Sequence, residues 1–333
     1  ELNAQLTARC EAHFYDFVRH SWGLIDSSAP YKDNWHAGAV AEHCQAVAMG
    51  QIQRLGINMP PSFGKTNIVS IQLPAWVWAR KKVTASQRLG ATMQFMCATY
   101  DQRRSTEANM KMRDLILSEW YQERWGHVQL RADYSMKTAY ATTDGGKRIA
   151  MSVTAPRMGE HPHYKIIDDP HNPKKPFLSE NEILATTGFY EWFKMRGAMI
   201  NAATILVMQR LHEHDLTGYL RTRSGEDWFW LVLPMRWEPK AMVVLSPLGW
   251  RDPREGHEGA LLWPSMWSEA RVTETCKPGT YADASLFQQR PAPAGGLLFK
   301  REHFKIAHAR PSNVIRRVRA WDIAGTDAAH ATS

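Results

Sequence analysis

The sequence predicts an α/β protein with a mostly parallel β-sheet and flanking helices, because short apolar runs alternate with longer helical stretches. Two other observations agree. A turn containing Gly-Lys-Thr (64–66) lies directly between a strand-like run and a helix, and a later apolar run (164–168) ends in two adjacent acids, Asp168 and Asp169. Strand, loop and helix in direct succession are typical of such sheets.

Six strand-like runs can be placed along the chain: 53–59, 94–99, 148–153, 164–168, 202–208 and 314–322. Helices are expected within residues 1–55, where apolar positions recur at helical spacing, over 67–80 as a Trp-rich amphipathic helix, and over 101–118 as a polar helix. Asp144-Gly145-Gly146 predicts a hairpin turn. Beyond about residue 230 the chain becomes rich in Pro, Gly and Trp, which suggests a small lid or connecting subdomain, with a linker near 290–296.

Length and composition indicate a globular protein of one large domain with an appendage, or of two domains. The chain has 333 residues, of which 44% are hydrophobic and 22% charged. Its 41 Lys and Arg against 33 Asp and Glu make a formal charge of +8, which suits an acidic partner. No apolar run of about eighteen residues occurs, so we expect no membrane span.

The four cysteines lie far apart in the sequence and form no Cys-x-x-Cys pair. This spacing argues against a disulfide framework or a zinc ribbon and suggests a reducing cytoplasm. The chain opens at Glu1 without an initiator Met and stops at Ser333 just after a strand-like stretch. We therefore expect it to be part of something longer.

The run Pro61-Ser62-Phe63-Gly64-Lys65-Thr66 is the strongest candidate site. Gly64 lets the backbone approach phosphates, Lys65 places an ammonium at the β- and γ-phosphate oxygens, and Thr66 supplies a hydroxyl for Mg²⁺. The usual pattern has a Gly five residues before the second one, and Met59 stands there instead. An ordinary turn before a helix is the alternative.

The acidic pair strengthens the phosphate-loop interpretation. Enzymes of this kind also hold Mg²⁺ and polarise a water molecule, and the expected place is a hydrophobic strand that ends in acids. We assign Asp168 to the Mg²⁺ shell and Asp169 to orienting or deprotonating the attacking water. A turn that merely caps a strand is the alternative. The long separation from Lys65 favours the ATPase branch that inserts a strand between the two motifs.

Several other conspicuous residues are interpreted as structural. Two tryptophan pairs, in the helix after the phosphate loop and in an alternating run, are expected to pack in the core: Trp76, Trp78, Trp228 and Trp230. Three histidines flank the acidic pair: His161, His163 and His171. Their dispersed spacing and the acid-rich site favour oxygen-ligated Mg²⁺ over zinc.

Four segments together resemble, in order, the large subunit of tailed-bacteriophage terminase, the motor that packages viral DNA. They are Asn58–Thr66, Ile166–His171, Leu206–Gly218 and Phe287–Pro291. The likeness covers most of residues 35–326, and the Gln-Arg-Leu-His-Glu stretch within Leu206–Gly218 is more specific than the two phosphate-site motifs. The resemblance implies a P-loop NTPase of the ASCE type, with ATP and Mg²⁺ as cofactors.

The resemblance also implies roles for residues that the motifs alone do not explain. The strand end Met208-Gln209-Arg210 matches the coupling motif, where a polar residue senses the γ-phosphate and passes its loss to the lid. Arg157 sits where related motors carry an arginine that reaches the ATP of the neighbouring subunit. Relatives commonly have an arginine where this chain has Ser62, which puts more weight on such a trans arginine.

The resemblance divides the chain into an ATPase core (1–228), a lid or linker subdomain (229–298) and the beginning of an RNase H-like nuclease (299–333). Asp322 matches the first metal-binding acid of that nuclease, which uses Mg²⁺ or Mn²⁺, and Asp327 is a possible second contact. The other ligands would lie beyond Ser333. Residues 301–319 hold six Lys or Arg and one acid, a run that suits DNA phosphate or a solvated face.

The expected function is therefore ATP-driven packaging of double-stranded DNA into a procapsid, with an endonuclease that cuts concatemers. The partners implied are the portal protein, the small terminase subunit and further copies in a pentameric ring, in the host cytoplasm and transiently on the procapsid, with no membrane. Two alternatives remain: another P-loop nucleic-acid motor such as a helicase, and a non-hydrolysing DNA-binding or portal-adaptor module. Trp35, His36 and Arg54 are candidate adenine contacts by position only.

Overall fold

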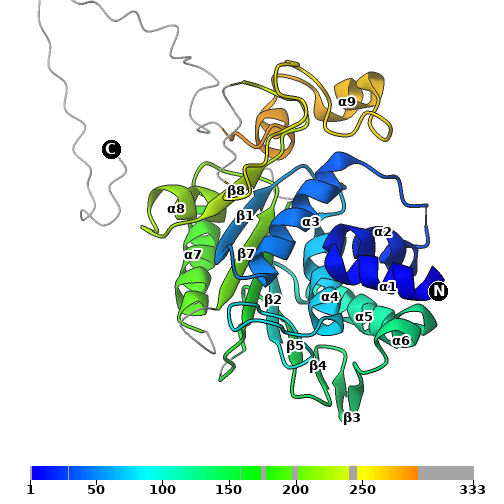
Figure 1. The fold of residues 1–333 in the computed structure, drawn as a ribbon. Coiled ribbons are helices and arrows are strands. Elements are labelled where there is room, and N and C mark those ends of the chain that lie inside the picture. The colour runs from blue at the N-terminus through cyan, green and yellow to red at the C-terminus, as the bar shows by residue number, and fades with distance from the viewer. Residues whose placement is uncertain are drawn as a thin grey trace, which may run out of the picture. The chain divides into compact units, whose positions relative to one another are not determined.

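The computed structural model describes residues 2–28, 30–157, 159–173, 178–196, 202–239 and 246–291. These residues belong to one compact unit that runs from Glu1 to Ala292. At its centre lies a sheet of eight strands in the order β3-β4-β5-β2-β6-β7-β1-β8, with helices on both faces (Figure 1). The predicted α/β class is confirmed.

Six strands of the sheet run parallel: β1 (Arg54–Asn58), β2 (Gln94–Thr99), β5 (Lys147–Ser152), β6 (Tyr164–Asp168), β7 (Ala203–Met208) and β8 (Phe229–Val232). The hairpin strands β3 (Leu130–Met136) and β4 (Ala139–Thr142) pair antiparallel at one edge. β7 lies between β1 and β6, so the strand inserted between the two phosphate-site motifs is present. β8, which pairs with β1, places four residues of the range 229–298 in the central sheet.

Two groups of helices sandwich the sheet. One face is covered by α1 (Leu2–Ala12), α2 (Phe14–Ile25), α3 (Trp35–Ala48), η1 (Asn67–Gln72), α4 (Leu73–Ala79), α5 (Gln102–Leu117) and α6 (Glu119–Trp125). The other face carries α7 (Glu180–Lys194) and α8 (Leu216–Thr222). Successive β2 residues alternate between the two cores, since Phe95 and Cys97 enter the first while Met96 and Ala98 enter the second.

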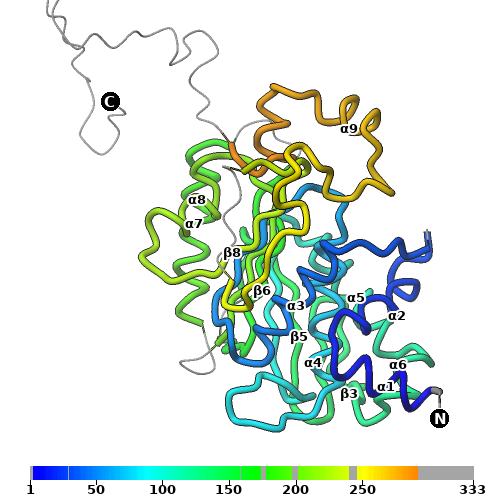
Figure 2. Tube along the Cα trace, turned by 45° about the horizontal axis from the view of Figure 1, so that its top comes forward, coloured from blue at the N-terminus to red at the C-terminus, as the bar shows by residue number. Residues whose placement is uncertain are grey.

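Residues 246–291 contain α9 (Glu269–Cys276) and the short helix η2 (Asp283–Phe287). This segment, yellow to orange in Figures 1 and 2, lies beyond the carboxyl ends of the parallel strands. It therefore faces the edge of the sheet at which the sequence places the phosphate loop and the acids.

The helix after the phosphate loop differs from the prediction. It begins as a π-helical turn, η1, and continues as α4. Every residue from Ile68 to Ala79 is buried, so the helix is not amphipathic. The cause is the N-terminal helices, which cover the side that would otherwise face solvent: the indole of Trp76 donates to the Cys10 carbonyl at 2.7 Å. The predicted core role of the tryptophans is confirmed, because Trp76, Trp78, Trp228 and Trp230 are all buried.

Two further observations concern the cysteines and the helices. The four cysteines are buried and carry no disulfide. Within the described ranges, no helix combines the length and the apolar character that crossing a lipid bilayer requires.

A substitution at Gly56 tests how tightly β1 packs against β8. A Cβ at this position would lie 2.2 Å from a ring carbon of Trp230 on the neighbouring strand β8. We expect Gly56→Ala to lower the free energy of unfolding by about 1–3 kcal/mol, as overpacked core substitutions do, which chemical denaturation measures. Gly188→Ala in α7 is the matched control, since nothing lies within 4 Å of its Cβ and helix propensity predicts a gain of about 0.5–1 kcal/mol. Equal stability of the two variants would contradict the packing argument.

Candidate active site

The loop between β1 and η1 has a backbone that phosphate binding can use. Ser62 and Gly64 both adopt positive φ, 68° and 77°, on either side of Phe63. Two constraints favour glycine at position 64. One is its positive φ, and the other is the ring of Trp22, which would lie 2.6 Å from a Cβ there. Phe63 is buried and stacks on Trp267 at 5.8 Å, which anchors the loop between its two left-handed residues.

Lys65 brings three elements together at the carboxyl edge of the sheet. Its ammonium lies 3.3 Å from a carboxylate oxygen of Asp169, which follows β6, and donates to the amide oxygen of Gln209, which follows β7. The side chain of Lys65 is almost completely buried. Because β6, β7 and β1 are adjacent parallel strands, their carboxyl ends deliver these three residues to one place.

Asp168 sits deeper and is held by two hydroxyl groups. Thr66 donates to one carboxylate oxygen at 3.2 Å and Ser70 to the other at 2.7 Å. Burial, followed by the neighbouring charge of Asp169, raises the pKa of Asp168 to about 6. A buried carboxylate beside a second acid and a hydroxyl fits Mg²⁺, which prefers such oxygen ligands and would relieve the cost of ionisation. Ser70 is a site residue that the sequence did not reveal.

Asp169 occupies a strained position that turns its side chain toward the loop. Its φ is 45°, in the left-handed region, and its backbone is held on both sides: its N–H donates to Val207 and its carbonyl accepts from Tyr100. The carboxylate accepts from the Gln209 N–H at 3.3 Å. The side chain of Asp169 is 19% exposed, whereas Asp168 as a residue is 3% exposed, so Asp169 is the acid more open to water.

A cavity of about 620 Å³ opens beside the loop. Gly64, Lys65, Thr66, Asp169 and Gln209 line one part of it. The lining also includes four apolar and aromatic side chains that the sequence did not single out, Trp22 and Tyr31 from the N-terminal region and Trp263 and Met266 from the segment beyond β8, as well as Asp26, Ser28 and Lys32. Trp22 and Tyr31 contact each other, with ring centroids 5.1 Å apart. The cavity thus combines the residues of the phosphate loop with aromatic side chains.

The residues suggested by position as adenine contacts do not line this cavity. Arg54 begins β1, at the opposite end of the strand from the loop, and forms an ion pair with Glu226 at 3.4 Å. Trp35 stacks on Trp250, and His36 lies behind the loop with its ring 3.3 Å from the Phe63 carbonyl. These three residues are near the loop in the sequence, but the fold gives them other neighbours. Arg54 pairs with Glu226, Trp35 packs on Trp250, and His36 contacts the backbone of the loop.

A second, smaller cavity of about 120 Å³ lies on the other side of Thr66, Asp168 and Asp169. Arg104, near the start of α5, lines both cavities, and its guanidinium lies 5.5 Å from the centre of the Tyr100 ring. Arg104 therefore contributes a positive charge to the lining of both cavities from within the same chain. The sequence indicated a polar helix here but not this placement.

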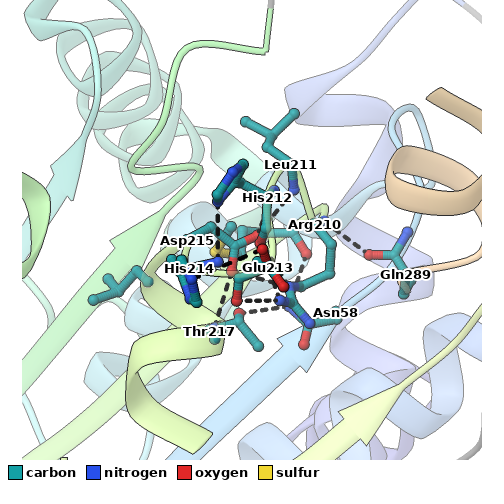
Figure 3. Close-up of polar contacts among 12 residues, drawn as sticks. Asn58, Arg210, Leu211, His212, Glu213, His214, Asp215, Thr217 and Gln289 are labelled. Atoms are coloured by element: carbon teal, nitrogen blue, oxygen red, sulfur yellow. Dashed lines mark hydrogen bonds and ion pairs between the residues drawn. The ribbon is translucent and has the colours of Figure 1, made fainter. Parts of the chain in front are cut away.

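The two arginines predicted as catalytic lie elsewhere. Arg157 donates to the Thr138 hydroxyl at 3.2 Å, and three strands separate β5, which precedes it, from β1. It is therefore remote from the phosphate loop of its own chain. Arg210 is buried and its Nε lies 2.9 Å from both carboxylate oxygens of Asp215 (Figure 3). Asp322 and Asp327, the candidate nuclease acids, lie outside the described residues.

The histidines near the acids have structural partners. His171 accepts from the Leu216 N–H at 3.0 Å, and burial lowers its pKa to about 4, which keeps the ring neutral. His163 accepts from the Gln94 N–H at 3.1 Å. Across the parts of the chain that the structure describes, no group of three or more His, Cys, Asp or Glu side chains could hold a metal ion together.

Comparisons with known proteins give a partial likeness of fold. No family model matches the chain, and no curated protein matches it. Among solved structures, it is similar to the large terminase of bacteriophage HK97 (13% identity, TM-score 0.45) over 68% of this chain and 44% of that one. It is also similar to the large terminase of a thermophilic bacteriophage (10% identity, TM-score 0.38) over 58% of this chain and 44% of that one. The chain thus spans less than half of either structure, and at these values the comparisons assign it no function.

The raised pKa of Asp168 predicts a pH-dependent stability. A carboxyl whose pKa is about 6 in the folded chain, against 3.8 ordinarily, contributes stability that is complete below about pH 4 and is lost as the pH rises through 6. Asp168→Asn cannot ionise, so without metal and nucleotide its free energy of unfolding should exceed that of the native chain above pH 6, by on the order of 3 kcal/mol. Urea denaturation between pH 4 and 8 measures this.

The difference between the Asp168→Asn variant and the native chain should shrink steadily toward pH 4. Asp144→Asn, which removes an exposed carboxylate from the hairpin turn, controls for the loss of a surface charge. A difference for Asp168→Asn that stays constant over the whole pH range would contradict the burial argument.

Proposed function

We propose that this chain is the ATP-hydrolysing part of a large terminase subunit, an ATP-driven motor that packages viral double-stranded DNA. The observation that carries the proposal is the meeting of Lys65, Asp169 and Gln209 at three strand ends beside a cavity of suitable size. A phosphate loop, a water-accessible acid and a polar sensor are the parts that phosphoryl transfer to water requires. The motif residues 206–218 favour terminase over other P-loop motors.

In the proposed reaction, Lys65 holds the β- and γ-phosphates of ATP and exchanges its contacts with Asp169 and Gln209 for phosphate oxygens. Asp169 then accepts the proton of the water that attacks the γ-phosphorus, while the bond from that phosphorus to the bridging oxygen breaks and ADP leaves. Mg²⁺, held by Asp168 and Thr66, would neutralise phosphate charge. Gln209, which no longer contacts Lys65, is positioned to respond to the γ-phosphate.

The aromatic side chains in the lining of the cavity support binding of the adenine base. Trp22, Tyr31 and Trp263 line the cavity, and aromatic rings stack well on nucleobases. Trp22 also limits the room beside Gly64. Trp263 and Met266 belong to the segment beyond β8, which we assign to the lid range 229–298. Nucleotide binding would thereby link that segment to the core, whose range we take as 1–228.

The wider assembly is proposed on the motif resemblance. It comprises duplex DNA, the portal protein, the small terminase subunit and a pentameric ring of this chain, in the host cytoplasm and on the procapsid. In a longer chain, residues from 299 onward would begin a nuclease that uses Mg²⁺ or Mn²⁺, with Asp322 as its first metal ligand. A non-hydrolysing adaptor is the alternative, because Met59 replaces the first glycine of the loop; the water-accessible Asp169 favours hydrolysis.

The first test removes the two charges at the centre of the site. We expect Lys65→Ala to abolish nucleotide binding and Asp169→Ala to leave binding but lower the DNA-stimulated turnover about 100-fold or more, in the range of general-base catalysis. Turnover is measured by phosphate release and binding by a fluorescent ATP analogue. Asp144→Ala, at an exposed turn, should behave as the native chain. Near-normal turnover in either site variant would refute the assignment.

The second test asks whether Arg157 acts on a neighbouring subunit. Since Arg157 is remote from its own phosphate loop, Arg157→Ala alone should lower turnover about 1000-fold, as loss of an arginine finger does. Mixing the inactive Arg157→Ala and Lys65→Ala chains should restore activity, because a Lys65→Ala neighbour still supplies its arginine to an intact site. If the mixture stays inactive while the native chains hydrolyse ATP, Arg157 does not act in trans.

A further inference from the structure

We propose that Gln289 is a positioning residue that connects the γ-phosphate sensor at the end of β7 to the segment beyond β8. The proposal rests on the ATPase function proposed above and adds to it the route by which the site reaches that segment. Its basis is a single hydrogen bond between two buried groups far apart in sequence. The side-chain oxygen of Gln289 accepts from the backbone N–H of Arg210 at 3.0 Å (Figure 3).

The β7 end of this connection is held rigidly. Asp215 accepts from the Arg210 guanidinium and from the backbone N–H groups of Leu211, His212 and Gly218, all at 2.9–3.2 Å. Burial alone would raise the pKa of Asp215, but the charge of Arg210, the neighbouring His171 and the hydrogen bonds that the carboxylate accepts together outweigh burial and lower the pKa. The carboxylate therefore stays charged and locks the turn 210–218. The side chain of Arg210 thereby makes the turn 210–218 one unit, and its backbone N–H donates to Gln289.

Gln289 is also held at its own end. It is 3% exposed, and its φ is 55°, a left-handed conformation that a glutamine rarely adopts. Its side-chain nitrogen donates to the carbonyl of Leu286 in η2. The side-chain amide of Gln289 therefore connects the turn after β7 to η2. Its direction depends on the left-handed backbone of Gln289, a conformation of higher energy.

The residues next to Gln289 extend the connection. The carbonyl of Phe287 accepts from the Met235 N–H at 2.8 Å, and the side chain of Gln288 accepts from the Arg236 N–H at 2.9 Å and donates to the Arg236 carbonyl at 3.1 Å. The strand-like stretch after β8 is therefore fastened to the residues that precede Gln289. Gln209, whose side chain contacts Lys65, is covalently joined to Arg210. A shift of Gln209 toward phosphate would move the Arg210 N–H and, through Gln289, this whole segment.

The test compares Gln289 with a glutamine outside the connection. Gln289→Asn shortens the side chain so that it no longer reaches the Arg210 N–H, and asparagine tolerates the left-handed backbone. We expect the steady-state kcat for ATP to fall about tenfold while the Kd for a fluorescent nucleotide changes less than threefold. Gln129→Asn alters an exposed glutamine whose side chain bonds Gln122 and Gly126, and its kcat should stay within twofold of the native value. Circular dichroism and thermal melting check folding, and Gln289→Gly, which suits the same φ, is the second variant.

A double-mutant comparison separates positioning from general destabilisation. In a Gln209→Ala background, Gln289→Asn should cause no further loss of kcat, because Gln289 acts through the sensor. A full tenfold loss in that background, or a native kcat in both Gln289 variants, would overturn the inference while leaving the ATPase proposal intact. The absence of ATP hydrolysis by the native chain with duplex DNA would instead refute the proposed function. That outcome differs from the two above, because in both of them the native chain is active.

Discussion

The contact of the Lys65 ammonium with Asp169 and Gln209 is the constraint on which the site depends. A buried ammonium is costly without a partner, and the partners here come from the two strand ends nearest to the loop. The strand order places β7 between β1 and β6, so one lysine can reach both. The left-handed residues Ser62 and Gly64 aim the loop back over the sheet edge, and the left-handed Asp169 turns its carboxylate up to meet the lysine.

A buried hydrogen-bond network holds the residue that donates to Asp168. Ser70, which donates to Asp168, belongs to the π-helical turn η1, and its carbonyl accepts from the fully buried Arg148 at 2.6 Å. Arg148 also bonds the side chain of Asn109 in α5 at 2.8 Å, so a strand and two helices are tied together behind the acids. This network keeps the donors of Asp168 in place. Burial and the charge of Asp169 raise the pKa of Asp168, whereas at Asp215 the charge of Arg210 and the hydrogen bonds to the carboxylate help to lower the pKa.

The N-terminal helices and the segment beyond β8 do more than cover the sheet. Trp22 from α2 packs against Gly64 and lines the large cavity, which Trp263 and Met266 close from the other side. The nucleotide-sized space therefore lies among three parts of the chain that are far apart in sequence. A second connection between the sheet and the segment beyond β8, through Gln289, approaches from the strand β7 that carries Gln209. The segment beyond β8 is thus attached to this sheet edge at several places, since the Tyr281 hydroxyl also donates to the Leu211 carbonyl at 2.9 Å.

The sequence alone determined the class of fold and most of the strands. It also singled out Lys65, Thr66, Asp168, Asp169 and Gln209, which the structure brings together at one sheet edge. Each of these depends on a local pattern: an apolar run, a turn or a polar residue at a strand end. The sequence could not place side chains whose role depends on distant neighbours. Ser70, Trp22 and Tyr31 were not identified. Arg104 and Gln289 lay in segments that the sequence analysis noted without giving either residue a role. Arg54 and Trp35 were considered near the base and lie elsewhere. Arg210 illustrates the difference best, since its position after a strand is visible in the sequence, whereas its ion pair with Asp215 exists only because the turn 210–218 folds back and buries both charges together.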